Sequence, residues 1–149
     1  MWLAVAAWLA AAVCASAATG KVIKVLPQLL DLKGRNSLTP SLYERDSYQA
    51  HLREHTNLCS GMVFYIQWKT RGQAMAPLKL RVDLRGVAHG NFPRELRLEQ
   101  EAVPRHWFNS WAEIKLVGEE YKKFGQVTAW RVTLWEGDRQ LSEQQSFLW

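Results

Sequence analysis

The sequence predicts a mainly β fold, an antiparallel β-sandwich of about seven strands with one short helix near its N-terminal end. From residue 61 onward the apolar residues recur with a period of two, as in strands that bury one face. Turn residues separate these runs at short intervals, and no helical pattern alternates with them, which argues against a parallel sheet. The chain has 149 residues, of which 48% are hydrophobic and 22% charged, and this predicts one folded domain.

The first 20 residues carry no charged side chain and are almost wholly Ala, Val, Leu and Trp. Ala15 and Ala17 supply the small residues that signal peptidase accepts, so we expect a signal peptide at residues 1–17 and a single domain at residues 18–149. No Lys or Arg precedes the apolar run, and this leaves an uncleaved anchor open, with membrane contact only through residues 2–19. The protein is therefore expected to be secreted or periplasmic, or alternatively membrane-anchored.

Residues 41–55 are expected to form the helix. Thr39 and Pro40 supply an N-cap and a proline for the first turn, and Ser41 with Glu44 forms an overlapping capping-box pattern. The helix is only weakly amphipathic, and its buried side would come from Leu42, Tyr48, Leu52 and Tyr43. Residues 21–32 predict an extended segment before it, an edge strand interrupted at Pro27.

The remaining chain alternates between apolar and polar residues. Strands are expected at residues 62–68, 78–85, 95–102, 112–117, 126–135 and 140–149, with a tight helical turn at residues 118–124. Trp68 and Trp130 fall on the inward faces of their strands. The last 24 residues are expected to form a β-hairpin, with its turn at residues 136–139.

This order of elements resembles an immunoglobulin or fibronectin type III-like sandwich over roughly residues 62–149. The resemblance rests on the Trp-bearing core strand at residues 64–68, on a corner at residues 116–121 and on the terminal hairpin. The chain departs from antibody domains because it lacks their paired cysteines and because Tyr121 precedes its strand by several residues. Such sandwiches serve as adhesins, chaperones, carbohydrate binders and enzyme appendages, so the resemblance implies a fold and no single activity.

The sharpest catalytic pattern is formed by His51, Glu54 and His55, which match the H-x-x-E-H motif of inverzincin metalloproteases. Two His residues four apart share a helix face, so they could hold zinc while Glu54 activates a bound water. A small zinc-dependent hydrolase is one alternative function, and a noncatalytic metal site of His51, His55 and Cys59 has the same helical spacing. An exposed polar helix face is the simpler interpretation, and we expect no cofactor.

Six Trp follow residue 17, which is many for a domain of this size. Trp107, Phe108 and Trp111 lie close together in a predicted loop beside Arg105. If they are exposed, they could stack on sugar rings or anchor a protein partner, because aromatic and Arg side chains dominate such contacts. The other interpretation is a loop folded over the open end of the sandwich.

All 19 Lys and Arg residues follow residue 20, and the net charge is +5. A basic surface attracts polyanions, but the basic residues are scattered among acidic ones, which indicates a solvated surface. Export makes nucleic acid an unexpected partner. The leading hypothesis is a noncatalytic module that binds a protein or a cell-envelope glycan through loop aromatics or an open sheet edge, with a structural envelope protein as a further alternative. No residue is assigned a catalytic role.

Overall fold

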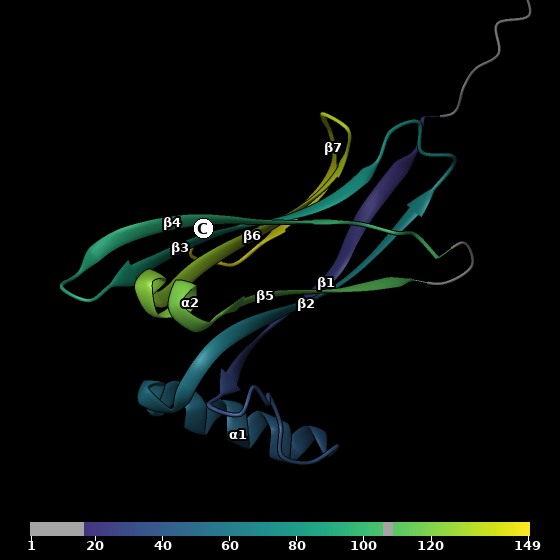
Figure 1. Ribbon diagram of the computed structural model, residues 1–149. Helices are drawn as coiled ribbons and strands as arrows, with labels where there is room; N and C mark the ends of the chain where they lie inside the picture. Colours follow the sequence, from purple (N-terminus) through teal and green to yellow (C-terminus); the bar gives the residue numbers. More distant parts are fainter. Residues whose placement is uncertain (1–16, 106–108) are drawn as a thin grey trace, which may run out of the picture.

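A computed structural model describes residues 17–105 and 109–149, and within them seven strands form two antiparallel sheets (Figure 1). The three-stranded sheet has the order β1-β2-β5 and consists of β1 (Thr19–Asp31), β2 (Cys59–Arg71) and β5 (Ser110–Val117). The four-stranded sheet has the order β4-β3-β6-β7 and consists of β4 (Phe92–Glu101), β3 (Leu78–Ala88), β6 (Gln126–Glu136) and β7 (Arg139–Gln145). Two short helices, α1 (Leu42–Glu54) and α2 (Gly118–Phe124), and a 3₁₀ turn at Thr56–Leu58 complete the described elements. The predicted mainly β fold is confirmed.

The core lies between the two sheets and is built by the residues that alternate inward. On β2 these are Phe64, Ile66 and Trp68, none more than 1% exposed. The four-stranded sheet contributes a matching layer, with Leu80, Val82, Leu84, Val132 and Leu134 all buried. Trp130 packs against this core from β6, so both inward Trp predictions are confirmed. Burial of these side chains is the main stabilising contribution to the fold.

The two sheets meet along one side and are open along the other. On the closed side β1 lies beside β7, where the backbone N–H of Val22 donates to Ser142 Oγ at 2.7 Å. Gly20 leaves the room for this approach, because a Cβ there would lie 2.7 Å from Leu134 and 2.9 Å from Leu141. On the open side, no described strand pairs with the outer edge of β4 or of β5.

Helix α1 lies against one end of the three-stranded sheet (Figure 1). The side-chain amide of Gln49 bonds β1 much as a neighbouring strand would: its Oε1 accepts from Leu29 N–H at 2.8 Å and its Nε2 donates to the Leu29 carbonyl at 2.9 Å. Ser41 caps the helix by accepting from the N–H of Glu44, as its capping-box position predicts. The prediction of Thr39 as an N-cap followed by Pro40 in the first turn is wrong, because both residues precede the helix and the Thr39 hydroxyl donates to the Glu44 carboxylate instead. By register, Leu30 and Val63 point to the outer face of the three-stranded sheet. Both are nevertheless buried, at the end of the sheet against which α1 lies.

The prediction of the buried side of α1 is wrong for its first turn. Leu42 is 66% exposed and Tyr43 is 82% exposed, whereas Leu52 is fully buried and Tyr48 is half-buried. The helix contacts the sheet only through its second half, where Gln49 bonds to β1. A polar residue makes the main contact, so an apolar pattern could not reveal it.

Asp31 anchors the chain between β1 and α1. The residue is 6% exposed, and its carboxylate accepts hydrogen bonds from the backbone N–H groups of Lys33 and Arg35, from the guanidinium of Arg35 and from Tyr48 Oη, at 2.7 to 2.9 Å. Burial by itself would raise the pKa of this carboxyl, but the hydrogen bonds outweigh it and hold the pKa well below its usual range. The same network raises the pKa of Tyr48, because its hydroxyl donates to the carboxylate.

Several strands differ from the sequence prediction in their bounds, β1 and β7 among them. β1 continues through Pro27, which pairs in register with Phe64, because an edge strand tolerates a residue without an N–H on its outer side. β7 ends at Gln145 instead of continuing to residue 149. Ser146 still bonds to both backbone groups of Trp130, and the N–H of Trp149 then donates to the Ser146 carbonyl in a final turn.

No helix among the described residues is long and apolar enough to cross a membrane. The predicted signal peptide or anchor lies almost wholly at residues 1–16, outside those residues.

Candidate functional site

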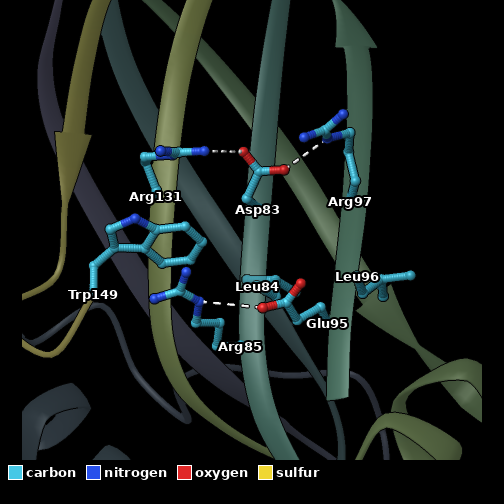
Figure 2. A pocket seen from close by; sticks show the side chains of 8 residues that line it. All are labelled: Asp83, Leu84, Arg85, Glu95, Leu96, Arg97, Arg131 and Trp149. Carbon is cyan, nitrogen blue, oxygen red and sulfur yellow. Dashed lines mark hydrogen bonds and ion pairs between the residues drawn. The ribbon is translucent and has the colours of Figure 1, made fainter. Parts of the chain in front are cut away.

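The outer face of the four-stranded sheet carries a cross-strand ion-pair network, centred on Asp83 (Figure 2). Asp83 is 8% exposed and lies on β3, between Arg97 of β4 and Arg131 of β6. Its Oδ1 accepts from Arg97 Nε at 2.7 Å, and its Oδ2 accepts from Arg131 Nη2 at 3.2 Å. One carboxylate thus holds two guanidinium groups on neighbouring strands.

Two indoles extend this network along the sheet. The indole of Trp149 packs against two arginines: the guanidinium carbons of Arg85 and Arg131 lie 4.1 and 4.7 Å from its ring centre (Figure 2). Trp135 contacts Arg81 in the same way, at 4.6 Å. These are cation–π distances, at which the ring face attracts the cation. Both indoles therefore fix the orientation of arginine side chains on the sheet surface.

A shallow hollow of about 330 Å³ lies beside Trp149, and Arg85, Arg97 and Arg131 line it. Each arginine already has an acidic partner, since Arg85 pairs with Glu95 at 3.4 Å and the other two pair with Asp83. Farther along β3 the pairing continues: Glu99 binds Lys79 and Arg81, and their hydrogen bonds lower its pKa. Such self-neutralised cross-strand pairs stabilise a sheet. We interpret this face as structural.

A different surface lies at the end of the three-stranded sheet away from α1. It is made by Lys21 and Lys24 of β1, Lys69 and Arg71 of β2, and Trp111 of β5, and we call it the basic–aromatic surface. Val22 and Trp68 are paired and face the core, so their neighbours point to the opposite, outer side. A bulge at residue 23 places both lysines of β1 on that outer side.

The four cations of this surface are not neutralised. None forms an ion pair with a carboxylate among the described residues, and Lys21 lies directly opposite Lys69 in the sheet register. Like charges directly opposite each other destabilise a strand pair. Lys21, Lys69 and Arg71 also line a hollow of about 260 Å³ that has no acidic residue in its wall. The surface therefore presents an excess of positive charge that an anion would relieve.

Trp111 lies at the edge of the same surface. Lys24, Gln67 and Trp111 form one row across β1, β2 and β5, and the indole is 53% exposed. The nearest acid on the outer face of β5 is Glu113, which pairs with Lys115 at 3.4 Å. A flat sheet face with cations, an amide and an exposed indole can bind a polar ligand by charge and by stacking together.

The predicted loop cluster is placed only in part. Trp107 and Phe108 lie outside the described residues. Arg105 is exposed, and its backbone N–H donates to Ser110 Oγ at 2.9 Å. Trp111 is exposed as the binding hypothesis requires, but it lies in strand β5 and not in a loop, because its pairing with Gln67 extends the sheet by two residues.

The histidines of the H-x-x-E-H pattern are close to each other on the exposed side of α1. The rings of His51 and His55 have their centres 4.3 Å apart, and Nδ1 of His55 lies 3.0 Å from the carbonyl oxygen of His51. Cys59 is buried, its thiol donates to the Leu52 carbonyl at 3.4 Å, and burial raises its pKa. Within the described ranges no three His, Cys, Asp or Glu side chains are grouped to hold a metal, so neither Glu54 nor Cys59 completes such a set.

Sequence reasoning missed the basic–aromatic surface. Its cations come in two pairs, one on β1 and one on β2, that are separated by more than forty residues in the chain, and in the sequence they lie scattered among acidic residues. They meet because β1 pairs with β2 in one particular register. The period of two does reveal that Lys69 and Arg71 share a face, but the partner strand cannot be read from it.

Comparison with protein-family models, with curated proteins and with solved structures found no match to this chain. Function is therefore inferred from the two surfaces themselves. One is neutralised by its own carboxylates, and the other is not.

Proposed function

We propose that this protein is a noncatalytic β-sandwich module that works outside the cytoplasm and binds an acidic polysaccharide of the cell envelope. The basic–aromatic surface is the proposed binding site. The observation that carries this proposal is the group of four cations without carboxylate partners beside the exposed Trp111. Seven strands in two antiparallel sheets also support the immunoglobulin or fibronectin type III-like resemblance, and that architecture includes carbohydrate binders.

The charge pattern favours a polymer that bears carboxylates at intervals. Lys21 and Lys69 are cross-strand neighbours, and Arg71 follows Lys69 on the same face, about 7 Å farther along the strand. The planar fork of Arg71 suits a carboxylate, whereas the lysines act as point charges. An extended acidic chain can neutralise several of these cations at once. A single small anion would reach only one or two.

The exposed indole favours a sugar over the other polyanions. The face of an indole is apolar and electron-rich, so it packs against the C–H groups of a pyranose ring. Gln67, between Lys24 and Trp111, adds a donor and an acceptor for hydroxyl groups. The predicted export places envelope polysaccharides, and not nucleic acid, within reach of this surface.

Replacing Lys69 and Arg71 by Gln is expected to weaken binding to sodium polygalacturonate about tenfold, because each lost charge contributes on the order of 0.5 to 1 kcal/mol at an exposed site. The measurement is calorimetric titration of the full chain at low salt, repeated at higher salt, where screening should weaken native binding. The matched control is the Lys33→Gln/Arg53→Gln variant, which removes two exposed cations near α1 and should bind as the native chain does.

Three outcomes would contradict this assignment. Equal loss of affinity in the Lys33→Gln/Arg53→Gln control would mean general attraction to a basic protein. Equal binding to neutral dextran would mean that charge is not used. Binding to phosphatidylglycerol vesicles without binding to polygalacturonate would identify a lipid headgroup as the ligand.

Trp111→Ala tests the stacking contact separately. We expect polygalacturonate affinity to fall about fivefold, since a stacked aromatic contributes about 1 kcal/mol. The melting temperature should change little, because the indole is 53% exposed and lies on the outer face. Unchanged affinity in this variant, together with weakened binding in the charge variant, would leave an anion site without sugar stacking.

A further inference from the structure

We propose that two copies of this chain pair through the open edges of their β5 strands, in one antiparallel register centred on Ile114. The result is a six-stranded sheet in the order β1-β2-β5-β5-β2-β1. This inference goes beyond the proposed function and does not depend on it.

β5 is an open edge that can accept another strand. β2 occupies one side of it, and no described strand pairs with the other. Alternate backbone N–H and C=O groups of β5 therefore point away from the sheet without a strand partner. The outer face of this strand also carries two of the large exposed apolar residues, Trp111 and Val117, which are 53% and 46% exposed.

The sequence of β5 is complementary to itself. Its outward residues are Trp111, Glu113, Lys115 and Val117. An apolar residue lies three positions to either side of Ile114, and opposite charges lie one position to either side. When Ile114 lies opposite Ile114 of the second copy, Glu113 faces Lys115 of that copy, and the reverse pair forms by symmetry. Trp111 then faces Val117 of the second copy, also twice. Opposite charges and aromatic–β-branched pairs are both favourable cross-strand neighbours.

The neighbouring registers are worse. A symmetric antiparallel pair must be centred on a residue, because otherwise outward side chains would face inward ones. Centring on residue 113 places two Glu113 side chains opposite each other, and centring on residue 115 does the same with Lys115. Charge thus selects the register centred on Ile114 and disfavours both alternatives.

The second copy is also a better occupant for β5 than for β4, the other open edge. β4 begins with Phe92 and Pro93, and proline blunts an edge because it lacks an N–H. Three charged residues of β4, Glu95, Arg97 and Glu99, are already paired with β3. On β5 Glu113 and Lys115 pair only with each other, and they remain 54% and 51% exposed. They can exchange this pair for the two pairs across the seam without leaving a charge unpartnered.

The test is sedimentation equilibrium of the full chain over a range of concentrations, in a density-matched non-ionic detergent that keeps the apolar N-terminal segment soluble. A seam of two strands is small, so we expect a dimer with a dissociation constant on the order of micromolar to tens of micromolar. Glu113→Lys and Lys115→Glu each place two like-charged pairs in the seam, and each should weaken the dimer at least tenfold. Both side chains are exposed, so circular dichroism should show unchanged folding.

The matched controls restore the complementarity. The double variant Glu113→Lys/Lys115→Glu should dimerise like the native chain, and an equal mixture of the two single variants should form a heterodimer. A native chain that stays monomeric at about 200 µM would overturn the proposal, as would a dimer that both single variants leave unchanged. The second result would place the contact elsewhere, for example in the N-terminal segment. Binding of polygalacturonate is measured separately, and its absence leaves this test intact.

Discussion

Gly125→Ala is expected to destabilise the fold by roughly 3 to 5 kcal/mol. Gly125 ends α2 at a φ of 85°, a region that alanine adopts only with strain. A Cβ there would also press on the carbonyl oxygen of Val87 and lie 2.7 Å from Ala88 Cα. Both contacts are with the backbone of β3, so neither can be relieved by a side-chain rotation. Urea unfolding of the native and variant chains measures the difference.

The Gly118→Ala variant separates the two causes of this loss, the strained backbone conformation and the steric contact with β3. Gly118 begins α2 at a φ of 65°, but nothing lies within 4 Å of the position of its Cβ. This variant should lose only the conformational part, about 1 kcal/mol. If the two variants lost equal stability, the close approach of Gly125 to β3 would not be the cause.

Asp31→Asn is expected to cost about 2 to 4 kcal/mol at pH 7, because it removes a buried charge on which four donor groups converge. The pKa of the native carboxyl is lowered by folding, so its contribution is complete above the ordinary value of 3.8 and declines as the pH falls below it. The difference between native and variant should therefore be constant from pH 7 to about pH 5 and shrink on further acidification. Urea unfolding at a series of pH values measures it.

Asp46→Asn is the control for this pH dependence. Asp46 lies on α1, its side chain is 73% exposed and, among the described residues, it pairs with Arg45 alone, at 3.3 Å. Its replacement should change stability by less than about 0.5 kcal/mol at every pH. A loss at Asp31 that persisted undiminished at pH 2 would show that packing, and not the charge, holds the turn.

Much of the fold follows from patterns that the sequence displays locally. β3 is predicted from the alternation of Leu80, Val82 and Leu84 with charged residues, and these three side chains are indeed buried. The cap at Ser41 likewise marks the start of α1 to within one residue. Periodicity and capping depend on neighbours in the chain, so they can be read without knowing the partner of any element.

The candidate site and the exceptions depend on partners that are distant in the chain. The basic–aromatic surface exists only because β1 pairs with β2 in a register that places Lys21 opposite Lys69, a residue 48 positions later in the chain. The position of α1 against the sheet is set by the hydrogen bonds between the side-chain amide of Gln49 and the backbone of Leu29, and no hydropathy pattern indicates such a contact. Trp111 joins a strand because Gln67 offers it a partner. Which strands pair, and in which register, therefore cannot be deduced from this single sequence.

The contact of Gln49 with β1 also limits how the molecule can associate. Gln49 occupies the backbone groups of Leu29 near one end of β1, and Ser142 occupies the N–H of Val22 near the other. β1 therefore offers no uninterrupted row of backbone groups to an incoming strand, whereas β5 on the opposite side of the same sheet does. Each copy therefore offers one edge of this sheet, that of β5, to an added strand. Extension of this sheet then ends when two copies have met through β5, and β4, the open edge of the other sheet, is blunted by Pro93.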